Sequence, residues 1–387
     1  MLYANRVACF LAALLLWAQT SVAETDLSNY WSYSEFLDNA PAQREISQSF
    51  SERVRAMADV TGGVITKPVK IAVVYPGIQA SDYWRRSVSS FEARLREQKT
   101  PYVIYPYFTK PAREIRLQEK MIAEALKEDP DYLIFTLDAL RHENTIQKLV
   151  KQGRPKVIIQ NSTRPIKKWQ DQPFLYVGFD HAVGSEMLAE KFMKTFGKGT
   201  DYALFYGSRG LVSAARGDTF MNRVDAMHGS KVTASYYLDF DRERSRKAAL
   251  HLIKRNKMPK FIYACSTDIA LGVIDAAKEM NMLDKISVNG WGGGGDELEA
   301  LSVGELDFTV MRMNDDNGVA MAEAIYLDQT GRRGEVPQIY SGDIVLVDKS
   351  NTKAEIEALR KRAFRYSSQW QSSVDDVLRS DESDQKS

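Results

Sequence analysis

Residues 69–84 read Val-Lys-Ile-Ala-Val-Val-Tyr-Pro-Gly-Ile-Gln-Ala-Ser-Asp-Tyr-Trp, and this stretch decides the fold. Its first seven residues, 69–75, are rich in β-branched side chains, as is typical of a strand buried on both faces. Pro76 and Gly77 end the run, and an amphipathic helix is expected to follow. A buried strand followed by a helix is the opening unit of a parallel sheet. Because open α/β sheets bind ligands beyond the carboxyl ends of their strands, residues 79–84 are the first candidate for a binding site.

The same alternation of short apolar strands and amphipathic helices continues along the chain. We predict further strands at residues 102–108, 132–137, 156–160, 175–179, 202–206, 232–238, 261–265, 286–289, 308–311 and 344–347. Strands that alternate with helices form parallel sheets with right-handed crossovers. The number of strands exceeds what one domain usually holds, so the predicted fold class is α/β with two doubly wound lobes.

The segments before and after this region differ from it. Residues 1–23 combine Arg6, a short apolar run and the small-residue end Ser21-Val22-Ala23, which predicts a cleaved export signal. No later stretch approaches the roughly 20 apolar residues of a membrane helix. Residues 24–68 form a polar leader with one predicted helix at 42–60, and residues 366–387 form a polar tail whose end is expected to be disordered.

Charge and cysteine content narrow the possible partners. The chain has 52 basic and 51 acidic residues, and loss of Arg6 with the signal leaves 52 − 1 = 51 of each. A neutral chain with interspersed signs argues against nucleic acid or an anionic membrane as the main partner. Cys265 is the only cysteine after residue 23, so a free thiol is expected. Four scattered histidines make a structural zinc site improbable, and no cofactor is expected.

Three other predicted strand ends carry polar or indole groups like those of the first. They are Gln160-Asn161-Ser162, the run 265–268 (Cys-Ser-Thr-Asp), and Asn289-Gly290-Trp291 before four glycines. Each alone has a simpler interpretation, because Ser, Thr, Asn and Gly serve helix capping and turn geometry at such positions. Four in one chain favour a shared polar ligand.

Catalytic motifs are missing from the sequence. We find no nucleophile elbow, metal-ligand cluster or serine paired with histidine, and the glycine run at 292–295 is not followed by Gly-Lys-Ser/Thr. His181 follows Asp180 in a segment that we interpret as structural. The sequence therefore predicts a binding protein and not an enzyme. A sugar-sensing repressor is set aside, because it would have a helix-turn-helix in place of an export signal.

Several motifs resemble the periplasmic sugar-binding proteins of the ribose-binding type. They are 178–184 (Gly-Phe-Asp-His-Ala-Val-Gly), 268–272 (Asp-Ile-Ala-Leu-Gly), 289–291 and 304–310. The resemblance implies a type I periplasmic binding protein fold, with three crossovers between two lobes and the ligand in the cleft. We expect one lobe at 69–180 plus about 293–312, and the other at 181–292 plus about 313–365. Sugar binders commonly have Asn-Asp where this chain has Ser266-Thr267-Asp268, so an ordinary pyranose is not expected.

The leader and the stretches 79–84, 215–218, 291–295 and 311–313 more closely resemble the receptors for the quorum-sensing signal autoinducer-2 within this family. That resemblance implies a furanosyl borate diester as ligand, with borate as part of the ligand, and a membrane sensor kinase as partner, which the leader would serve. It also implies ligand contacts from Gln79, Ser81, Trp84, Asn161, Arg216, Ser266, Thr267, Trp291 and Arg312, with Thr136 and Asp138 as further candidates.

The chemistry of these residue types suits such a ligand. A cyclic polyol that carries tetrahedral borate is an anion, and arginine provides permanent charge with forked donors. The other interpretation of any arginine is a solvated surface charge, but Arg312 lies between two methionines at the end of an apolar strand. Two alternatives remain: a binding component of a sugar importer, which has the same fold, and an exported enzyme acting on carbohydrate.

Overall fold

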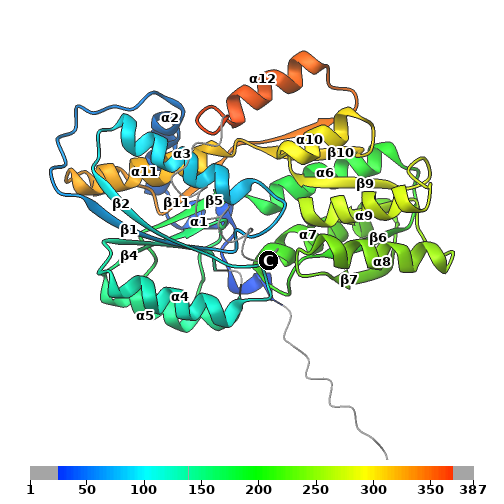
Figure 1. Cartoon of the computed structure of the whole chain (residues 1–387), viewed down its shortest axis with the longest axis horizontal. Coiled ribbons are helices and arrows are strands. Elements are labelled where there is room, and N and C mark those ends of the chain that lie inside the picture. Colours follow the sequence, from blue (N-terminus) through cyan, green and yellow to red (C-terminus); the bar gives the residue numbers. More distant parts are fainter. Residues whose placement is uncertain (1–24, 138, 369–387) are drawn as a thin grey trace, which may run out of the picture.

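The computed structural model describes residues 25–137 and 139–368, so the predicted export signal and residues 369–387 of the tail lie outside the described residues. Two lobes lie side by side, each built on a six-stranded sheet (Figure 1). The strand orders are β11-β5-β4-β3-β1-β2 and β12-β10-β9-β8-β6-β7. The predicted α/β fold with two doubly wound lobes is confirmed.

The sheet of the N-terminal lobe is parallel throughout. Its strands are β1 (Val69–Tyr75), β2 (Tyr102–Phe108), β3 (Tyr132–Phe135), β4 (Lys156–Gln160), β5 (Leu175–Phe179) and β11 (Ile339–Gly342). Alternate residues of β1 face opposite sides. Ile71 and Val73 pack with α3 (Tyr83–Glu97) and α11 (Asp315–Gln329), whereas Ala72 and Val74 pack with α4 (Ile115–Lys127) and α5 (Glu143–Gln152). Helices on both faces explain why β1 is apolar at every position except Lys70.

The C-terminal lobe repeats this plan around a second core. Its strands are β6 (Tyr202–Tyr206), β7 (Val232–Tyr237), β8 (Phe261–Ala264), β9 (Ser287–Gly292), β10 (Phe308–Arg312) and β12 (Ile344–Asp348). Its helices are α6 (His181–Thr195), α7 (Leu211–His228), α8 (Arg242–Lys254), α9 (Thr267–Glu279), α10 (Gly295–Ser302) and α12 (Lys353–Ala363). Only the edge strand β12 runs antiparallel, beside β10.

The chain passes between the lobes after β5, after β10 and after β11, and the second and third of these crossings differ from our expectation, which placed them near residues 292 and 312. We predicted residues 293–312 in the N-terminal lobe, but β10 pairs in parallel with β9, so they belong to the C-terminal lobe. Gly292 and Gly293, with φ of 144° and 64°, turn the chain within that lobe instead of leading out of it. Residues 313–342 then belong to the N-terminal lobe, where α11 packs against α3.

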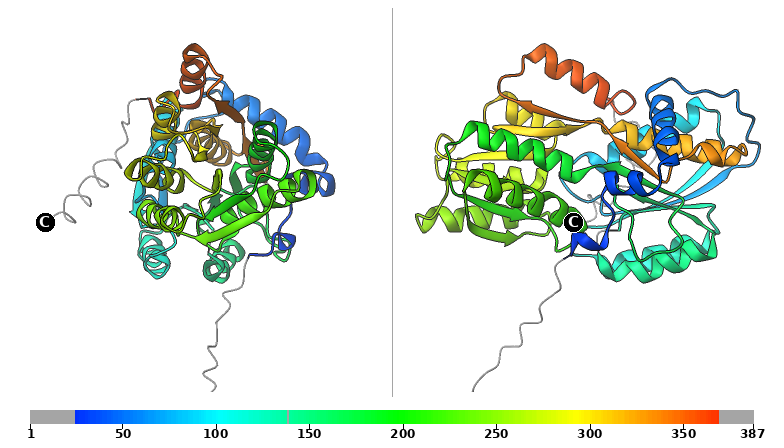
Figure 2. Two further views of the ribbon diagram at one scale, coloured as in Figure 1. Left: turned by 90° about the vertical axis from the view of Figure 1, so that its right-hand side faces the viewer. Right: turned by 180° about the vertical axis from the view of Figure 1, so that it is seen from behind.

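The leader is part of the N-terminal lobe (Figure 2, dark blue). It contains η1 (Leu27–Asn29), α1 (Tyr33–Asn39) and α2 (Ala42–Arg55), so the predicted helix at 42–60 begins as expected and ends earlier. Phe50 and Val54 are buried in the core of the lobe. Arg94 Nη2 donates to the carbonyl oxygen of Ala56 at 2.6 Å, which satisfies a carbonyl that a longer helix would use itself.

The end of the described chain also returns to the N-terminal lobe. Helix α12 packs on the C-terminal lobe through Ile356 and Leu359. After it, the backbone N–H groups of Tyr366 and Ser367 donate to the Asp315 carboxylate at 2.7 and 2.8 Å. The polar tail therefore does not begin at residue 366 as predicted, because Ser367 is fully buried. None of the helices in the described part has the length and apolar character needed to cross a membrane.

Candidate functional site

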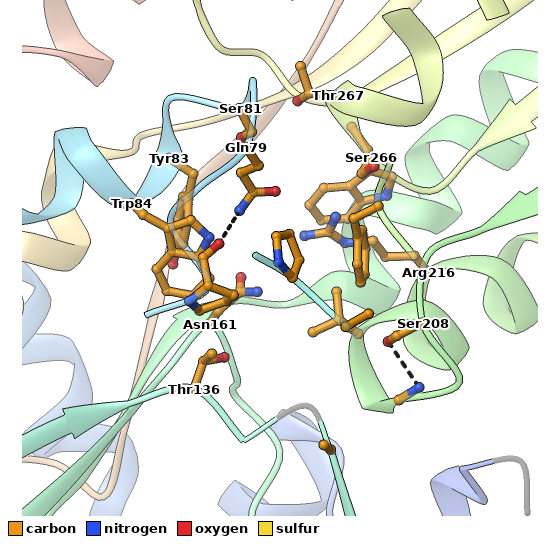
Figure 3. A pocket seen from close by; sticks show the side chains of 18 of the residues that line it. Gln79, Ser81, Tyr83, Trp84, Thr136, Asn161, Ser208, Arg216, Ser266 and Thr267 are labelled. Atoms are coloured by element: carbon orange, nitrogen blue, oxygen red, sulfur yellow. Dashed lines mark hydrogen bonds between the residues drawn. The ribbon is translucent and has the colours of Figure 1, made fainter. Parts of the chain in front are cut away.

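A cavity of about 300 Å³ lies between the two lobes. All nine predicted ligand contacts and Thr136 line it together, and Figure 3 labels each of them except Trp291 and Arg312. Asp138 lies outside the described residues. The N-terminal lobe contributes the loop after β1 and the ends of β3 and β4. The C-terminal lobe contributes the starts of α7 and α9 and the strands β9 and β10. The strand-end motifs therefore meet in one place, as parallel sheets require.

On the N-terminal side, the side chains are held before any ligand binds. The Gln79 amide donates to the carbonyl oxygen of Pro76 at 2.9 Å, which leaves its Oε1 as an acceptor. The Trp84 ring lies against Tyr75 and Tyr83, with ring centroids 4.7 Å apart in both pairs. Asn161 adopts a left-handed backbone, with φ of 66°, and its buried Oδ1 has no hydrogen-bond partner. This oxygen is an acceptor available to a ligand.

On the C-terminal side, Arg216 is fixed from three directions. Its guanidinium carbon lies 3.7 Å from the centroid of the Trp291 ring. Its Nη1 donates to the carbonyl oxygen of Cys265 at 2.8 Å, and its Nε donates to His181 Nδ1 at 3.3 Å. Such preorganisation lowers the entropy cost of binding a ligand.

His181 connects the two sides of the cleft. Because the arginine Nε can only donate, His181 Nδ1 accepts, and Nε2 carries the proton that it donates to the carbonyl oxygen of Asn161 at 3.1 Å. Burial, followed by the charge of Arg216, lowers the pKa of His181 well below its usual value, so the ring is neutral. His181 does not line the cavity and orients two residues that do, which agrees with its predicted structural role.

Arg312 is also buried, but the protein fixes its guanidinium group with fewer contacts than that of Arg216. Its guanidinium carbon lies 4.1 Å from the centroid of the Tyr83 ring, and its Nε has no hydrogen-bond partner. Gly292 makes this position possible, because a Cβ there would lie 2.7 Å from Arg312 Nη2. Neither Arg312 nor Arg216 forms a salt bridge with a carboxylate of the described residues.

The two arginines give the cavity a positive charge that no described lining carboxylate offsets, although Glu297 and Asp82 outside the lining oppose part of the pKa shift of Arg312. Burial lowers the pKa of Arg312, and burial together with the charge of Arg312 lowers the pKa of Arg216 to about 9. Both groups still carry their charge at neutral pH. Two like charges removed from water are costly unless an anion joins them, so the cavity is suited to an anionic ligand.

The N-termini of two helices add to the positive electrostatic potential of the cavity. Helix α9 begins at Thr267, and α7 begins beside Gly210, which has no side chain to cap it. Ser266 caps α9 by accepting from the backbone N–H of Ile269 at 3.4 Å, and it also lines the cavity. The capping and binding interpretations of this strand end are therefore compatible. Helix N-termini favour negative charge.

Some lining residues were missed by the sequence reasoning. Ser208 and Arg209 follow the end of β6, so the strand-end rule would have found them had we applied it there. Phe240 lies in a turn with φ of 56°, and no sequence pattern indicates that it reaches the cavity. In the ranges that the structure describes, no group of three His, Cys, Asp or Glu side chains is placed to hold a metal ion.

Cys265, whose backbone carbonyl oxygen accepts from Arg216, has a free thiol that is fully buried. Burial raises the pKa of this thiol, so it stays protonated at neutral pH. We expect a thiol reagent to label the native protein hardly at all and the urea-unfolded protein completely. Reductant should leave the melting temperature unchanged. A covalent dimer as the native form in non-reducing mass analysis would contradict this.

Comparisons with known proteins identify the family to which this fold belongs. Residues 71–333 match the family model described as a periplasmic binding protein domain. The ribose import binding protein RbsB of Salmonella typhimurium is 26% identical over 175 residues, which cover 45% of this chain and 58% of that protein. The RbsB protein of Escherichia coli matches to the same extent. The chain thus spans 58% of the length of these relatives.

Solved structures agree on the fold. A solute-binding protein from Agrobacterium vitis with bound D-fucose superposes with a TM-score of 0.67 at 18% identity, covering 74% of this chain and 98% of that one. One from Agrobacterium radiobacter in complex with D-arabinose gives a TM-score of 0.66 at 18% identity, with 76% and 99% covered. The match of the family model over most of the chain, together with this fold, shows that the protein belongs to the periplasmic binding protein domain family.

Proposed function

We propose that the protein is a periplasmic receptor that encloses one small cyclic polyol between its lobes. One observation carries this: amide, hydroxyl, guanidinium and indole groups from both lobes, remote in sequence, line a single cavity. Directional polar groups combined with flat aromatic walls suit a hydroxylated ring. The described lining residues include no pair of carboxyl groups that could act as acid and base, so we infer binding without chemistry.

The relatives favour one form of this function, the binding component of a sugar-type importer. The matched curated proteins are named ribose import binding proteins, and several similar structures hold monosaccharides. In this form the membrane partner is a transport permease, to which the closed receptor delivers its solute.

A second candidate is favoured by Arg216 and Arg312. A neutral sugar would leave both buried charges without a counter-ion inside the cavity, whereas a borate monoanion would partly compensate them there. This charge agrees with a receptor of the LuxP kind, which binds autoinducer-2 as a furanosyl borate diester and signals through a membrane sensor kinase. All nine contacts that this resemblance implies lie at the cavity.

The bound solute separates the two candidates. We would heat-denature the purified protein, identify what it releases, and titrate the refolded protein with autoinducer-2 precursor and with D-ribose, each with and without boric acid. A boron-containing ligand, together with precursor binding that needs boric acid, supports the autoinducer-2 receptor. A neutral sugar that binds equally in both buffers supports the importer component. Release of a chemically altered sugar would contradict both.

A further inference from the structure

Asp268 follows two cavity residues in sequence but does not line the cavity itself. Its Oδ1 accepts from the backbone N–H of Ala80 at 2.8 Å, and its Oδ2 accepts from the backbone N–H of Ser81 at 3.2 Å. Asp268 lies in the first turn of α9 in the C-terminal lobe, and the two amides belong to the loop after β1 in the N-terminal lobe. The carboxylate therefore joins the lobes.

The loop that it holds is the one that carries Gln79 and Ser81 to the cavity. A second hydrogen bond joins the end of this loop to the C-terminal lobe: the Asp82 carboxylate accepts from the backbone N–H of Gly295 at 3.0 Å. Between these points, the Ala80 side chain packs against the C-terminal core. Parting of the lobes would have to break all three contacts.

Burial strengthens the hydrogen bonds that the Asp268 carboxylate accepts. The residue is 3% exposed, so water does not compete for the carboxylate. Hydrogen bonds to a charged acceptor are roughly twice as strong as those between neutral groups. Burial raises the pKa of Asp268 to about 6, while the two amides and the nearby Arg242 act in the opposite direction. Near neutral pH the carboxylate is thus ionised and holds both amides.

The direction of the Asp268 side chain also affects the charge of the cavity. A carboxylate at this helix start that faced the cavity would offset Arg216 and Arg312. Because both oxygens of Asp268 are engaged by the loop, its charge is directed away from the ligand. One residue thus holds the lobes together and leaves the arginines available to an anion.

We propose that Asp268 is a positioning residue that clamps the loop bearing Gln79 and Ser81 onto the C-terminal lobe, and that it thereby sets how long a ligand stays enclosed. This inference rests on the proposed function, because it concerns residence in the same cavity.

The test compares Asp268→Asn with Asp275→Asn. Asp275 lies on the same helix and binds Arg242 within the C-terminal lobe only, so it controls for loss of a carboxylate on α9. Asparagine offers one acceptor in place of two and turns an N–H group toward one of the loop amides. We expect the dissociation rate of autoinducer-2 precursor with boric acid, or of D-ribose, to rise about 10- to 150-fold in Asp268→Asn and less than twofold in the control.

A second measurement needs no ligand. Spin labels at Lys148→Cys and Lys247→Cys, one on each lobe, would report the distance between lobes, and the buried Cys265 should not take up label. We expect a longer and broader distance distribution in Asp268→Asn than in wild type and the control, with an unchanged melting temperature. Distances and dissociation rates equal to wild type would overturn the inference. If wild type binds neither probe, the proposed function fails, and the distances alone still decide the role of Asp268.

Discussion

If the ligand is the anion that we propose as the second candidate, the Arg312→Met variant is expected to bind it about 30- to 5,000-fold more weakly than wild type. Removing one partner of a buried, hydrogen-bonded charge pair costs about 2 to 5 kcal/mol, which gives this range. Arg312 is 5% exposed, and its Nε has no partner within the protein, so a bound anion would receive a donor that nothing else uses. We expect Arg216→Met to behave in the same way. Calorimetric titration with autoinducer-2 precursor and boric acid measures both.

The Arg312→Met variant should lose affinity without losing folding stability. Measuring both quantities therefore distinguishes a binding defect from a folding defect. In the ligand-free protein the two guanidinium groups repel each other, since the charge of Arg312 lowers the pKa of Arg216. The ligand-free Arg312→Met variant should therefore be at least as stable to urea as wild type, a trade between stability and function that is common at binding sites. Arg312→Lys should fall between the two in affinity, because lysine keeps the charge and loses the fork.

Arg154→Met is the matched control, since this arginine is largely exposed and pairs only with surface aspartates. Its ligand affinity should equal that of wild type. If Arg312→Met instead weakens binding by only the cost of an ordinary hydrogen bond, about 0.5 to 1.5 kcal/mol, the ligand is neutral and the importer form of the function gains support.

The fold followed from the sequence where burial leaves a strong pattern. The predicted strand at 69–75 coincides with β1, because both faces of this strand are covered and every residue except Lys70 is buried. The strand-end rule then predicted the cavity residues at 79–84, 160–162, 265–268 and 289–291, because it depends only on the geometry of parallel sheets, whereas Arg216 and Arg312 came from the family resemblance. It worked for Asn161 and for Thr267 without any knowledge of the ligand.

Other features depend on contacts that no local pattern records. The short strand β11 reads Ile-Tyr-Ser-Gly, with only two apolar residues, and it was missed. The second crossing was misplaced because a glycine run serves a turn within a lobe as well as a connection between lobes. The Asp268 side chain hydrogen-bonds to the opposite lobe and does not line the cavity, and only the three-dimensional packing of the two lobes shows this.

A triad of charges beneath the leader leads to the other large expected effect. Glu323 on α11 is fully buried, and its two oxygens are bound by Arg94 on α3 and by Arg53 on α2 of the leader. Burial raises the pKa of Glu323, while the two arginines act against that shift. Asp59 also pairs with Arg53 and Glu97 with Arg94, but among the described residues the Glu323 carboxylate alone contacts both arginines.

Glu323→Met is expected to lower the free energy of unfolding by about 3 to 5 kcal/mol, because the fully buried Arg94 loses its nearest carboxylate and keeps only the longer contact to Glu97 at 3.4 Å. Urea unfolding followed by circular dichroism measures this loss. The exposed pair of Arg332 and Glu335 provides the control, and Glu335→Gln should cost less than about 1 kcal/mol.

The same triad predicts what the leader contributes. Arg94 also donates to the carbonyl oxygens of Val54 and Ala56, so a chain that lacks residues 25–60 loses these acceptors together with Arg53. We expect this truncation to destabilise the N-terminal lobe at least as much as Glu323→Met, and the two changes together to cost less than their sum, because they disrupt one network. A truncated chain with wild-type stability would show that the triad does not support the lobe. The leader would then be free to serve the pairing with a membrane partner that its resemblance predicts.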